Sequence, residues 1–205
     1  MDFNSPFLLF FIGLLYIIAM GALSLLRREG LSIRFAVESL LLIALIGGLA
    51  FATGFVMHPV FFLILLYLVT MRVRLMVDLG NSFASRRRLD TADRIYGLAQ
   101  WLGPDPASQV NIAINKGVVR LQQGMLDEAM RMFQKILTAR GKSSLGIKNE
   151  AACQYNLGVT YQRKGMETEA TRAFKAVLEV WPVSEYARRA AVALARQAHE
   201  GEVKP

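Results

Sequence analysis

Cysteine and histidine are scarce in this sequence of 205 residues, which has one cysteine, Cys153, and two histidines. A single cysteine excludes a disulfide framework and a cysteine-built zinc site, and two distant histidines do not predict a histidine metal cluster. The sequence also lacks a glycine-rich phosphate loop with its lysine, a dinucleotide fingerprint and a serine nucleophile elbow. We therefore predict no enzyme activity, no cofactor and no metal site, and we interpret Cys153 as a small buried apolar residue.

Charge is scarce in the first 71 residues. They carry only Asp2, Arg27, Arg28, Glu29, Arg34 and Glu38. Removing three charges of each sign from the totals of 24 basic and 16 acidic residues leaves 21 and 13 in the remaining 134, so the net charge of +8 belongs to the second part. Hydrophobic residues make up 54% of the chain, which is high for a soluble protein. We therefore predict a membrane anchor at 1–72 and a soluble domain at 73–205.

The charge-free runs are long enough to cross a membrane. Residues 6–26, at about 1.5 Å per residue, cover a hydrocarbon core of roughly 30 Å, and no basic stretch or cleavage site marks them as a cleaved signal peptide. The next run, 39–71, is too long for one span, and Thr53-Gly54 and His58-Pro59 place turn-forming residues in its middle. We therefore predict three transmembrane helices, at about 6–26, 35–53 and 55–73.

Arginines follow the first span and the third span. They are Arg27, Arg28 and Arg34 in the first loop, and Arg72, Arg74, Arg86, Arg87 and Arg88 after the last apolar run. The positive-inside rule favours the cytoplasm for both groups, and only three spans place both groups there. We expect an integral protein of a bacterial inner (plasma) membrane, with its N-terminus outside and residues 73–205 in the cytoplasm.

Two features of the second span have alternative interpretations. Ala44, Gly48 and Ala52 recur every four residues, a pattern that lets another helix approach closely. The partner is either a helix of this chain or a helix of a foreign membrane subunit. Glu38 follows Arg34 by four residues near the end of the span, which favours an interfacial ion pair over an ion path.

Three segments of the second part share one internal spacing. The clearest contains Gly158, Ala170, Phe174 and Pro182, and the others contain Gly117, Ala129 and Phe133, and Gly80, Ala92, Tyr96 and Pro104. Small residues at these positions let two helices cross closely, and we expect the aromatics to fill the groove between neighbouring hairpins. This spacing resembles the tetratricopeptide repeat, a helix-turn-helix unit of 34 residues, with copies at about 73–106, 110–143 and 151–184.

The resemblance implies an all-α fold, with three transmembrane helices followed by about three helix hairpins and a capping helix at 184–199. Ser184 is suited to the N-cap of that helix. The middle copy departs from the family at Lys116 and Arg120, and the segment 141–148 adds about seven residues before the third copy. Because no linker separates the spans from the repeats, we infer that the third span continues into the first repeat helix.

Members of the family bind a peptide or a partner helix on a concave face lined by the first helix of each hairpin. In this register the face holds Asn81, Asn115, Tyr155, Asn156 and Arg163. Asparagine amides can pair with the backbone of an extended ligand, although they can also bond within the repeats. The basic clamp that some family members use for a terminal carboxylate is missing, so we predict a neutral to mildly polar groove.

The basic residues near the anchor predict contact with lipid. Arg72, Arg74, Arg86, Arg87 and Arg88 follow the third span, and juxtamembrane basic residues are attracted to anionic lipid by about 1 kcal/mol each. Positive-inside signalling is the other interpretation of the triplet. We do not predict nucleic-acid binding, because no base-stacking aromatics are interleaved with these charges.

Together these features predict an integral membrane scaffold, adaptor or assembly factor that binds a protein or peptide partner through its cytoplasmic repeats. The alternative is a constitutive accessory subunit of a larger membrane complex. In that case the stripe of Ala44, Gly48 and Ala52 would be buried against other membrane subunits.

The predicted orientation can be tested by cysteine accessibility. A cysteine placed at residue 4 and another at residue 140 should react with a membrane-impermeant thiol reagent from opposite faces of the membrane, because an odd number of spans separates them. Modification of both from the same face would contradict the three-span topology.

Overall fold

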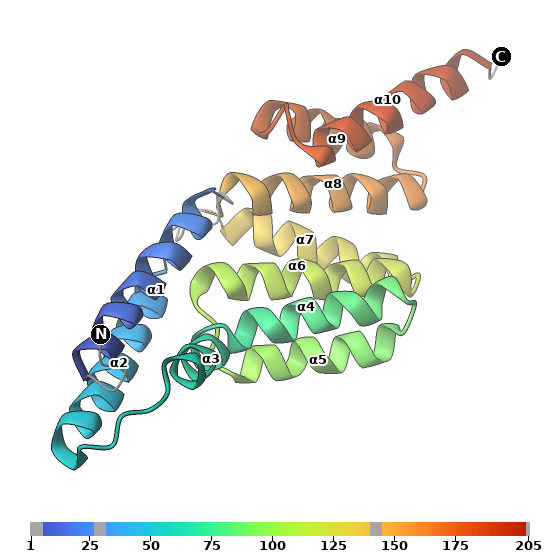
Figure 1. Cartoon of the computed structure of the whole chain (residues 1–205). Helices are drawn as coiled ribbons and strands as arrows, with labels where there is room; N and C mark the ends of the chain where they lie inside the picture. Colours follow the sequence, from blue (N-terminus) through green and yellow to red (C-terminus); the bar gives the residue numbers. More distant parts are fainter. Residues whose placement is uncertain (1–5, 27–31, 140–144, 204–205) are drawn as a thin grey trace. The chain divides into compact units, whose positions relative to one another are not determined.

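The computed structural model describes residues 6–26, 32–139 and 145–203 (Figure 1). Regular structure in these ranges is helical throughout, which confirms the all-α prediction. The chain divides into two compact units, Met1–Leu75 and Met76–Pro205, and the division falls inside helix α4, Arg72–Ser85. The loop arginines Arg27 and Arg28 and residues 141–144 of the segment 141–148 lie outside the described residues.

The first unit contains three apolar helices, α1 at Pro6–Leu26, α2 at Ile33–Thr53 and α3 at Pro59–Thr70. α1 and α2 have 21 residues each and are long and apolar enough to cross a membrane. α3 has 12 residues, about 18 Å of helix, and meets that description only together with α4. The described residues therefore contain two candidate spans, or three if the pair α3 and α4 counts as one.

A break at Met71 separates α3 from α4, and the two helices are bent by 70°. Thr70 Oγ1 donates a hydrogen bond to Leu66 O at 2.6 Å, and the Arg72 guanidinium donates one to Val69 O at 2.7 Å. Side chains that bond to carbonyls of the last turn compete with the helical ladder and favour a bend. The prediction of one continuous helix from the third span into the first repeat is therefore wrong.

Glycines set the packing of α1 on α2. A Cβ at Gly13 would lie 2.6 Å from Ile43 Cγ1, and one at Gly47 would lie 2.4 Å from the Phe10 ring, so both positions require glycine. The two helices share a buried core to which α3 also contributes side chains. Its buried residues are Leu9, Ile43, Ala50, Phe62 and Leu66. The neighbouring aromatic pair Phe7 and Phe51 packs edge to face at 5.2 Å.

The predicted stripe of small residues lies on a different face of α2. Ala44, Gly48 and Ala52 are exposed, and nothing lies within 4 Å of a Cβ built on Gly48. The interpretation that this stripe packs against the chain's own helices is wrong. The adjacent row with Ile43, Gly47 and Ala50 faces α1 and α3 instead.

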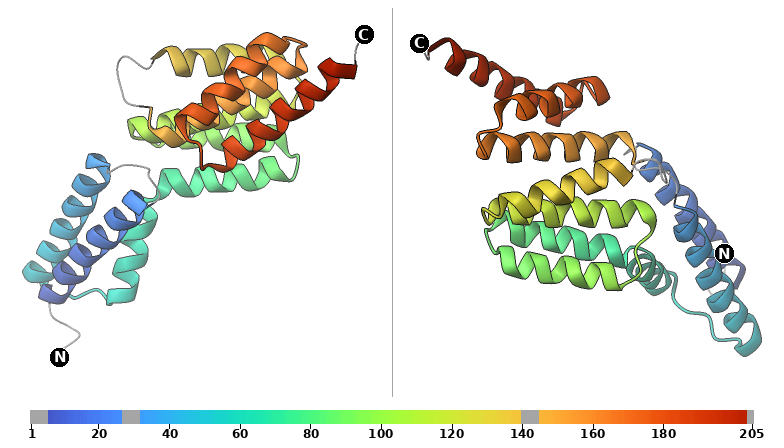
Figure 2. Two further views of the ribbon diagram at one scale, coloured as in Figure 1. Left: turned by 90° about the horizontal axis from the view of Figure 1, so that it is seen from above. Right: turned by 180° about the vertical axis from the view of Figure 1, so that it is seen from behind.

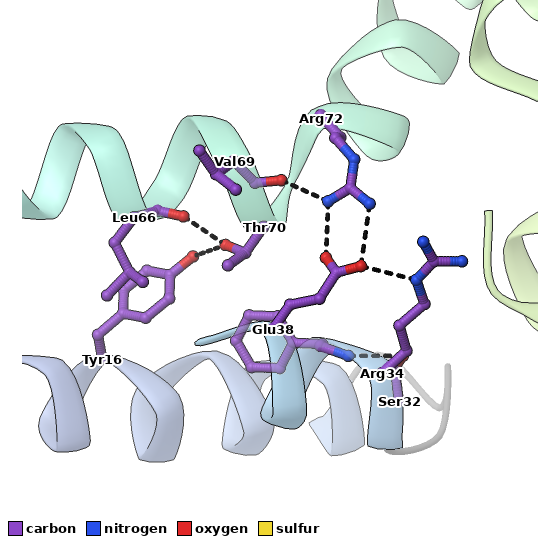
Figure 3. Close-up of polar contacts among 9 residues, drawn as sticks. Tyr16, Ser32, Arg34, Glu38, Leu66, Val69, Thr70 and Arg72 are labelled. Carbon is purple, nitrogen blue, oxygen red and sulfur yellow. Dashed lines mark hydrogen bonds and ion pairs between the residues drawn. The ribbon is translucent and has the colours of Figure 1, made fainter. Parts of the chain in front are cut away.

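Glu38 is the polar centre of the first unit (Figure 3). Its carboxylate accepts from Arg34 Nε at 2.7 Å, which confirms the predicted ion pair. It also accepts from both terminal nitrogens of Arg72, at 2.6 and 3.0 Å. Arg72 was expected to face lipid, but its guanidinium joins α2 to the start of α4 and is occupied by Glu38 and Val69 O.

The second unit is a stack of helix hairpins (Figures 1 and 2). Its helices after α4 are α5 at Leu89–Trp101, α6 at Pro106–Gln122, α7 at Leu126–Thr138, α8 at Ile147–Arg163, α9 at Glu167–Val180 and α10 at Glu185–Val203. α4 with α5, α6 with α7 and α8 with α9 form three hairpins. α10 packs against both helices of the third hairpin.

One glycine and one aromatic ring meet in each hairpin. A Cβ at Gly80 would lie 2.4 Å from the Tyr96 ring. The equivalent distances are 2.7 Å in the other two hairpins, from Gly117 to Phe133 and from Gly158 to Phe174. Each ring thus lies on the glycine of its own hairpin, and the Phe133 ring also shares a core with the next hairpin. Ala92, Ala129 and Ala170, the small residues of the second helices, are fully buried.

The middle hairpin replaces an apolar contact with a polar one at Arg120. Its guanidinium donates to Asp93 at 2.9 Å and to Glu128 at 3.1 Å, and so joins α5, α6 and α7. A third hydrogen bond, of 2.9 Å, goes to Gln123. The departure from the family pattern at this position therefore has a structural role.

Cys153 lies in the core between the second and third hairpins, as its interpretation as an apolar residue predicted. The thiol is fully buried and donates to Phe133 O at 3.4 Å. Burial raises the pKa of the thiol to about 12. The native thiol is therefore protonated and inaccessible, and it does not interfere with labelling of introduced cysteines.

Replacing Gly158 by alanine should destabilise the repeat unit. The new methyl group would meet the buried Phe174 ring at 2.7 Å, and overpacking of this kind costs about 1–3 kcal/mol. The matched control is Gly97→Ala, because that glycine is inside α5 with nothing within 4 Å of its Cβ position. The control should be neutral or stabilising by about 0.5–1 kcal/mol. Thermal unfolding of the full-length protein in detergent, followed by circular dichroism, measures both; equal shifts would contradict the contact.

Replacing Glu38 by glutamine should lower the stability of the first unit by about 1–3 kcal/mol, because two guanidinium groups lose their anionic acceptor. The double variant Glu38→Gln with Arg72→Gln should recover part of that loss, since it removes the unpaired cation. The same unfolding assay in detergent, applied to both single variants and the double variant, measures the interaction energy of the pair. Strictly additive losses would show that the two side chains do not interact.

Candidate functional site in the repeat unit

A groove of about 710 Å³ lies between α8 and α10. α8 lines it with Tyr155, Val159, Gln162 and Arg163, and α10 lines it with Glu185, Arg188, Arg189, Val192, Ala193 and Arg196. Residues three, four, seven and eight apart share one face of a helix, so each helix presents one continuous face to the groove. The groove therefore lies on the side of the first helices, where the family resemblance places the concave surface.

Two local features position α10. Ser184 Oγ accepts from the Ala187 amide at 3.0 Å and donates to Trp181 O at 2.8 Å, so Ser184 is the N-cap, as predicted. Ala187 and Ala190, on the opposite face of α10 from the groove, are buried in the core formed with Phe174 and Val177. The groove-lining side chains of α10 are thereby held opposite α8.

Tyr155 is the aromatic anchor of the groove. Its ring packs against Phe174, at a centroid distance of 5.9 Å, and against Tyr186, at 5.8 Å. Burial raises the pKa of the neighbouring Tyr186 phenol. The Tyr155 side of the groove is therefore a fixed apolar surface.

The charge of the groove is strongly positive. Four arginines face a single glutamate in its lining. Arg163 donates to Leu121 O at 3.1 Å, and Arg189 forms an ion pair with Glu185. Arg188 and Arg196 have no side-chain hydrogen bond or ion pair among the described residues. The prediction of a neutral to mildly polar groove is wrong, because it left out the side chains of the capping helix.

The structure brings together only two of the five residues predicted to bind a partner, Tyr155 and Arg163. Asn156 donates to Ala152 O at 2.8 Å within α8, and Asn115 donates to Asn111 Oδ1 at 3.2 Å within α6. Asn81 Oδ1 accepts from the Tyr96 hydroxyl at 2.6 Å, and burial raises the pKa of that phenol to about 12. These three amides bond within the repeats and do not line the groove.

Four residues of α10 line the groove although they are not among the predicted site residues: Arg188, Arg189, Val192 and Arg196. The sequence pattern that marks them is Arg188, Arg189 and Arg196, which are one, seven and eight residues apart, with alanines between them and Val192 on the same helix face. The pattern predicts a capping helix, but it does not specify which helix the arginine-bearing face will lie against.

The arginine triplet lies at the far end of α4. Arg86, Arg87 and Arg88 are exposed, and the Arg88 guanidinium lies 5.8 Å from the Phe83 ring centroid. About 20 Å of helix separates this turn from Arg72, and Arg74 is partly buried near the start of the same helix. Placement of the triplet near a membrane depended on the continuous helix, so its contact with lipid stays a prediction.

Among the residues that the structure describes, no three histidine, cysteine, aspartate or glutamate side chains gather closely enough to hold a metal ion. A family model described as Tetratricopeptide repeat matches residues 108–182. This range covers nearly all of the second and third hairpins. No curated protein matches the sequence. Residues 108–182 therefore form tetratricopeptide-like repeats, and repeats of this kind are scaffolds for protein–protein interaction.

Proposed function

We propose that this protein is an integral membrane scaffold, adaptor or assembly factor whose cytoplasmic repeats bind a protein partner in the groove between α8 and α10. The observation that carries the proposal is an open groove with an aromatic anchor and a charged rim in a repeat unit that follows directly on apolar helices. The repeats supply the binding surface and the anchor supplies the location.

The composition of the first unit supports the membrane location. α1 and α2 are long and apolar enough to cross a bilayer, and many of their large apolar side chains are exposed. Exposed apolar helices of this length are stable in lipid and unfavourable in water. The basic residues on either side of the apolar segments favour a cytoplasmic repeat unit with the N-terminus outside.

The dimensions and chemistry of the groove support partner binding. Its volume of about 710 Å³ is within the range of about 300–1,000 Å³ that is typical of ligand sites. Tyr155 is fixed by two neighbouring rings, so it loses little conformational freedom on binding. Val192 is 52% exposed in the same groove and offers an apolar contact.

The exposed stripe on α2 favours a second candidate function, that of a constitutive accessory subunit of a larger membrane complex. Ala44, Gly48 and Ala52 leave a smooth face on which a foreign helix can pack closely. In this alternative the membrane unit, rather than the groove, is the main contact with other subunits.

Filling the groove with a bulky side chain should abolish partner capture. We expect Val192→Trp to lose the proteins that crosslink to the wild-type repeat unit in intact membranes, because the indole occupies the groove. Val183→Trp is the matched control, since Val183 is 81% exposed and does not line the groove. Undiminished crosslinking by Val192→Trp would contradict the proposed site.

Gly48→Leu tests the alternative in the same experiment. If this variant loses the crosslinked proteins while Val192→Trp retains them, the accessory-subunit function replaces the adaptor function. Blue-native electrophoresis after gentle extraction gives a second measure. An accessory subunit migrates only in one large assembly, whereas an adaptor is partly free.

A further inference from the structure

We propose that the groove between α8 and α10 binds an acidic peptide segment that also carries aliphatic side chains. This inference rests on the proposed function and specifies the chemistry of the partner. It follows from the unpaired arginines of the groove and from the apolar surface between them.

Arg188 and Arg196 are positioned to bind carboxylates. They are eight residues apart on one face of α10, about 12 Å along the helix, and both line the groove. Neither side chain has a hydrogen bond or ion pair in the described part of the chain. A guanidinium presents a planar set of donors that matches a carboxylate, and such charge-assisted pairs are among the stronger polar contacts in proteins.

Arginines with a structural role look different in this protein. Arg120 makes three side-chain hydrogen bonds to Asp93, Glu128 and Gln123. In the groove, Glu185 forms its described ion pair with Arg189, and Arg163 donates one hydrogen bond to Leu121 O. The groove therefore keeps an excess of positive charge with unused donors, which acidic side chains of a ligand complement.

The surface between the arginines is apolar and favours a peptide over a nucleic acid. Val159, Val192 and Tyr155 line the same groove as the basic side chains of the two helices. Aliphatic side chains fit such a surface, whereas bases need a free aromatic face for stacking. The Tyr155 ring packs against Phe174 and Tyr186, and it is the one aromatic residue in the lining.

Selection from a random peptide library tests the proposal with the full-length protein. We would select a phage-displayed library of random dodecapeptides against the protein in nanodiscs of phosphatidylcholine, whose zwitterionic headgroups add no net charge. Peptides enriched by the wild type should contain more Asp and Glu than Lys and Arg, together with Leu, Ile or Val. Enrichment of neutral or basic peptides, or no enrichment over empty nanodiscs, would overturn the proposal.

Two double variants identify the charges that matter. The double variant Arg188→Gln with Arg196→Gln should bind the enriched peptides about tenfold or more weakly, because two charge-assisted contacts are lost. Arg172→Gln with Lys175→Gln removes the same charge from exposed positions on α9, outside this groove, and should change affinity less than about twofold. Equal effects would show attraction to net charge only. Displacement of the peptides by a tighter-binding uridine oligomer would assign the groove to nucleic acid.

The outcomes separate this inference from the proposed function. If Val192→Trp loses the crosslinked partners in membranes while the groove arginine variant keeps them, the groove binds a protein but not through acidic residues. If neither variant loses partners, the proposed function fails as well.

Discussion

Contact between an aromatic ring and a glycine of the facing helix sets the geometry of the repeat unit. Tyr96, Phe133 and Phe174 each lie where a Cβ on Gly80, Gly117 or Gly158 would clash, so the two helices of a hairpin approach closely at one defined point. A fixed crossing point determines which face of each first helix is turned away from its hairpin. In the third hairpin the face of α8 that lines the groove carries Tyr155, Val159 and Arg163, and the Tyr155 ring also packs against Phe174 of α9. The Phe174 ring that packs on Gly158 therefore also supports the groove residue Tyr155.

The first unit depends on a different kind of interaction. Its helices share an apolar core, and Glu38 adds a directional contact by holding Arg34 of its own helix and Arg72 from the start of α4. At the same end, Thr70 donates to Leu66 O, so its oxygen accepts from the Tyr16 hydroxyl at 2.7 Å (Figure 3). Polar contacts therefore fix the backbone where α3 ends and α4 begins, and a bend is stable there because the freed carbonyl of Val69 has a partner.

The arginines of this protein fall into groups according to what their donors meet. Arg72 and Arg120 each connect helices through carboxylates of the same unit. Arg188 and Arg196 reach no such acceptor among the described residues and line an open groove. Their exposed guanidinium groups lie beside the apolar residues of the groove and keep donors available for an acidic ligand. This difference supports a binding role for α10 beyond that of a cap.

Several features followed from the sequence because they depend on local pattern. The charge-free run at 6–26, the glycine and aromatic of each hairpin, Ser184 as an N-cap and the pairing of Arg34 with Glu38 involve residues within about one hairpin of each other. Other features depended on tertiary packing. Gly47 and Gly48 differ by one position, which is about 100° of helix rotation, and only the packing of α1 decides that Gly47 is buried and Gly48 exposed. Arg72 pairs with Glu38, which is 34 residues earlier in the sequence. The arginines of α10 form a binding surface only because the fold places them in one groove with Tyr155. A sequence pattern specifies the faces of a helix, and the helices that pack around it decide which face is covered and which is left to bind.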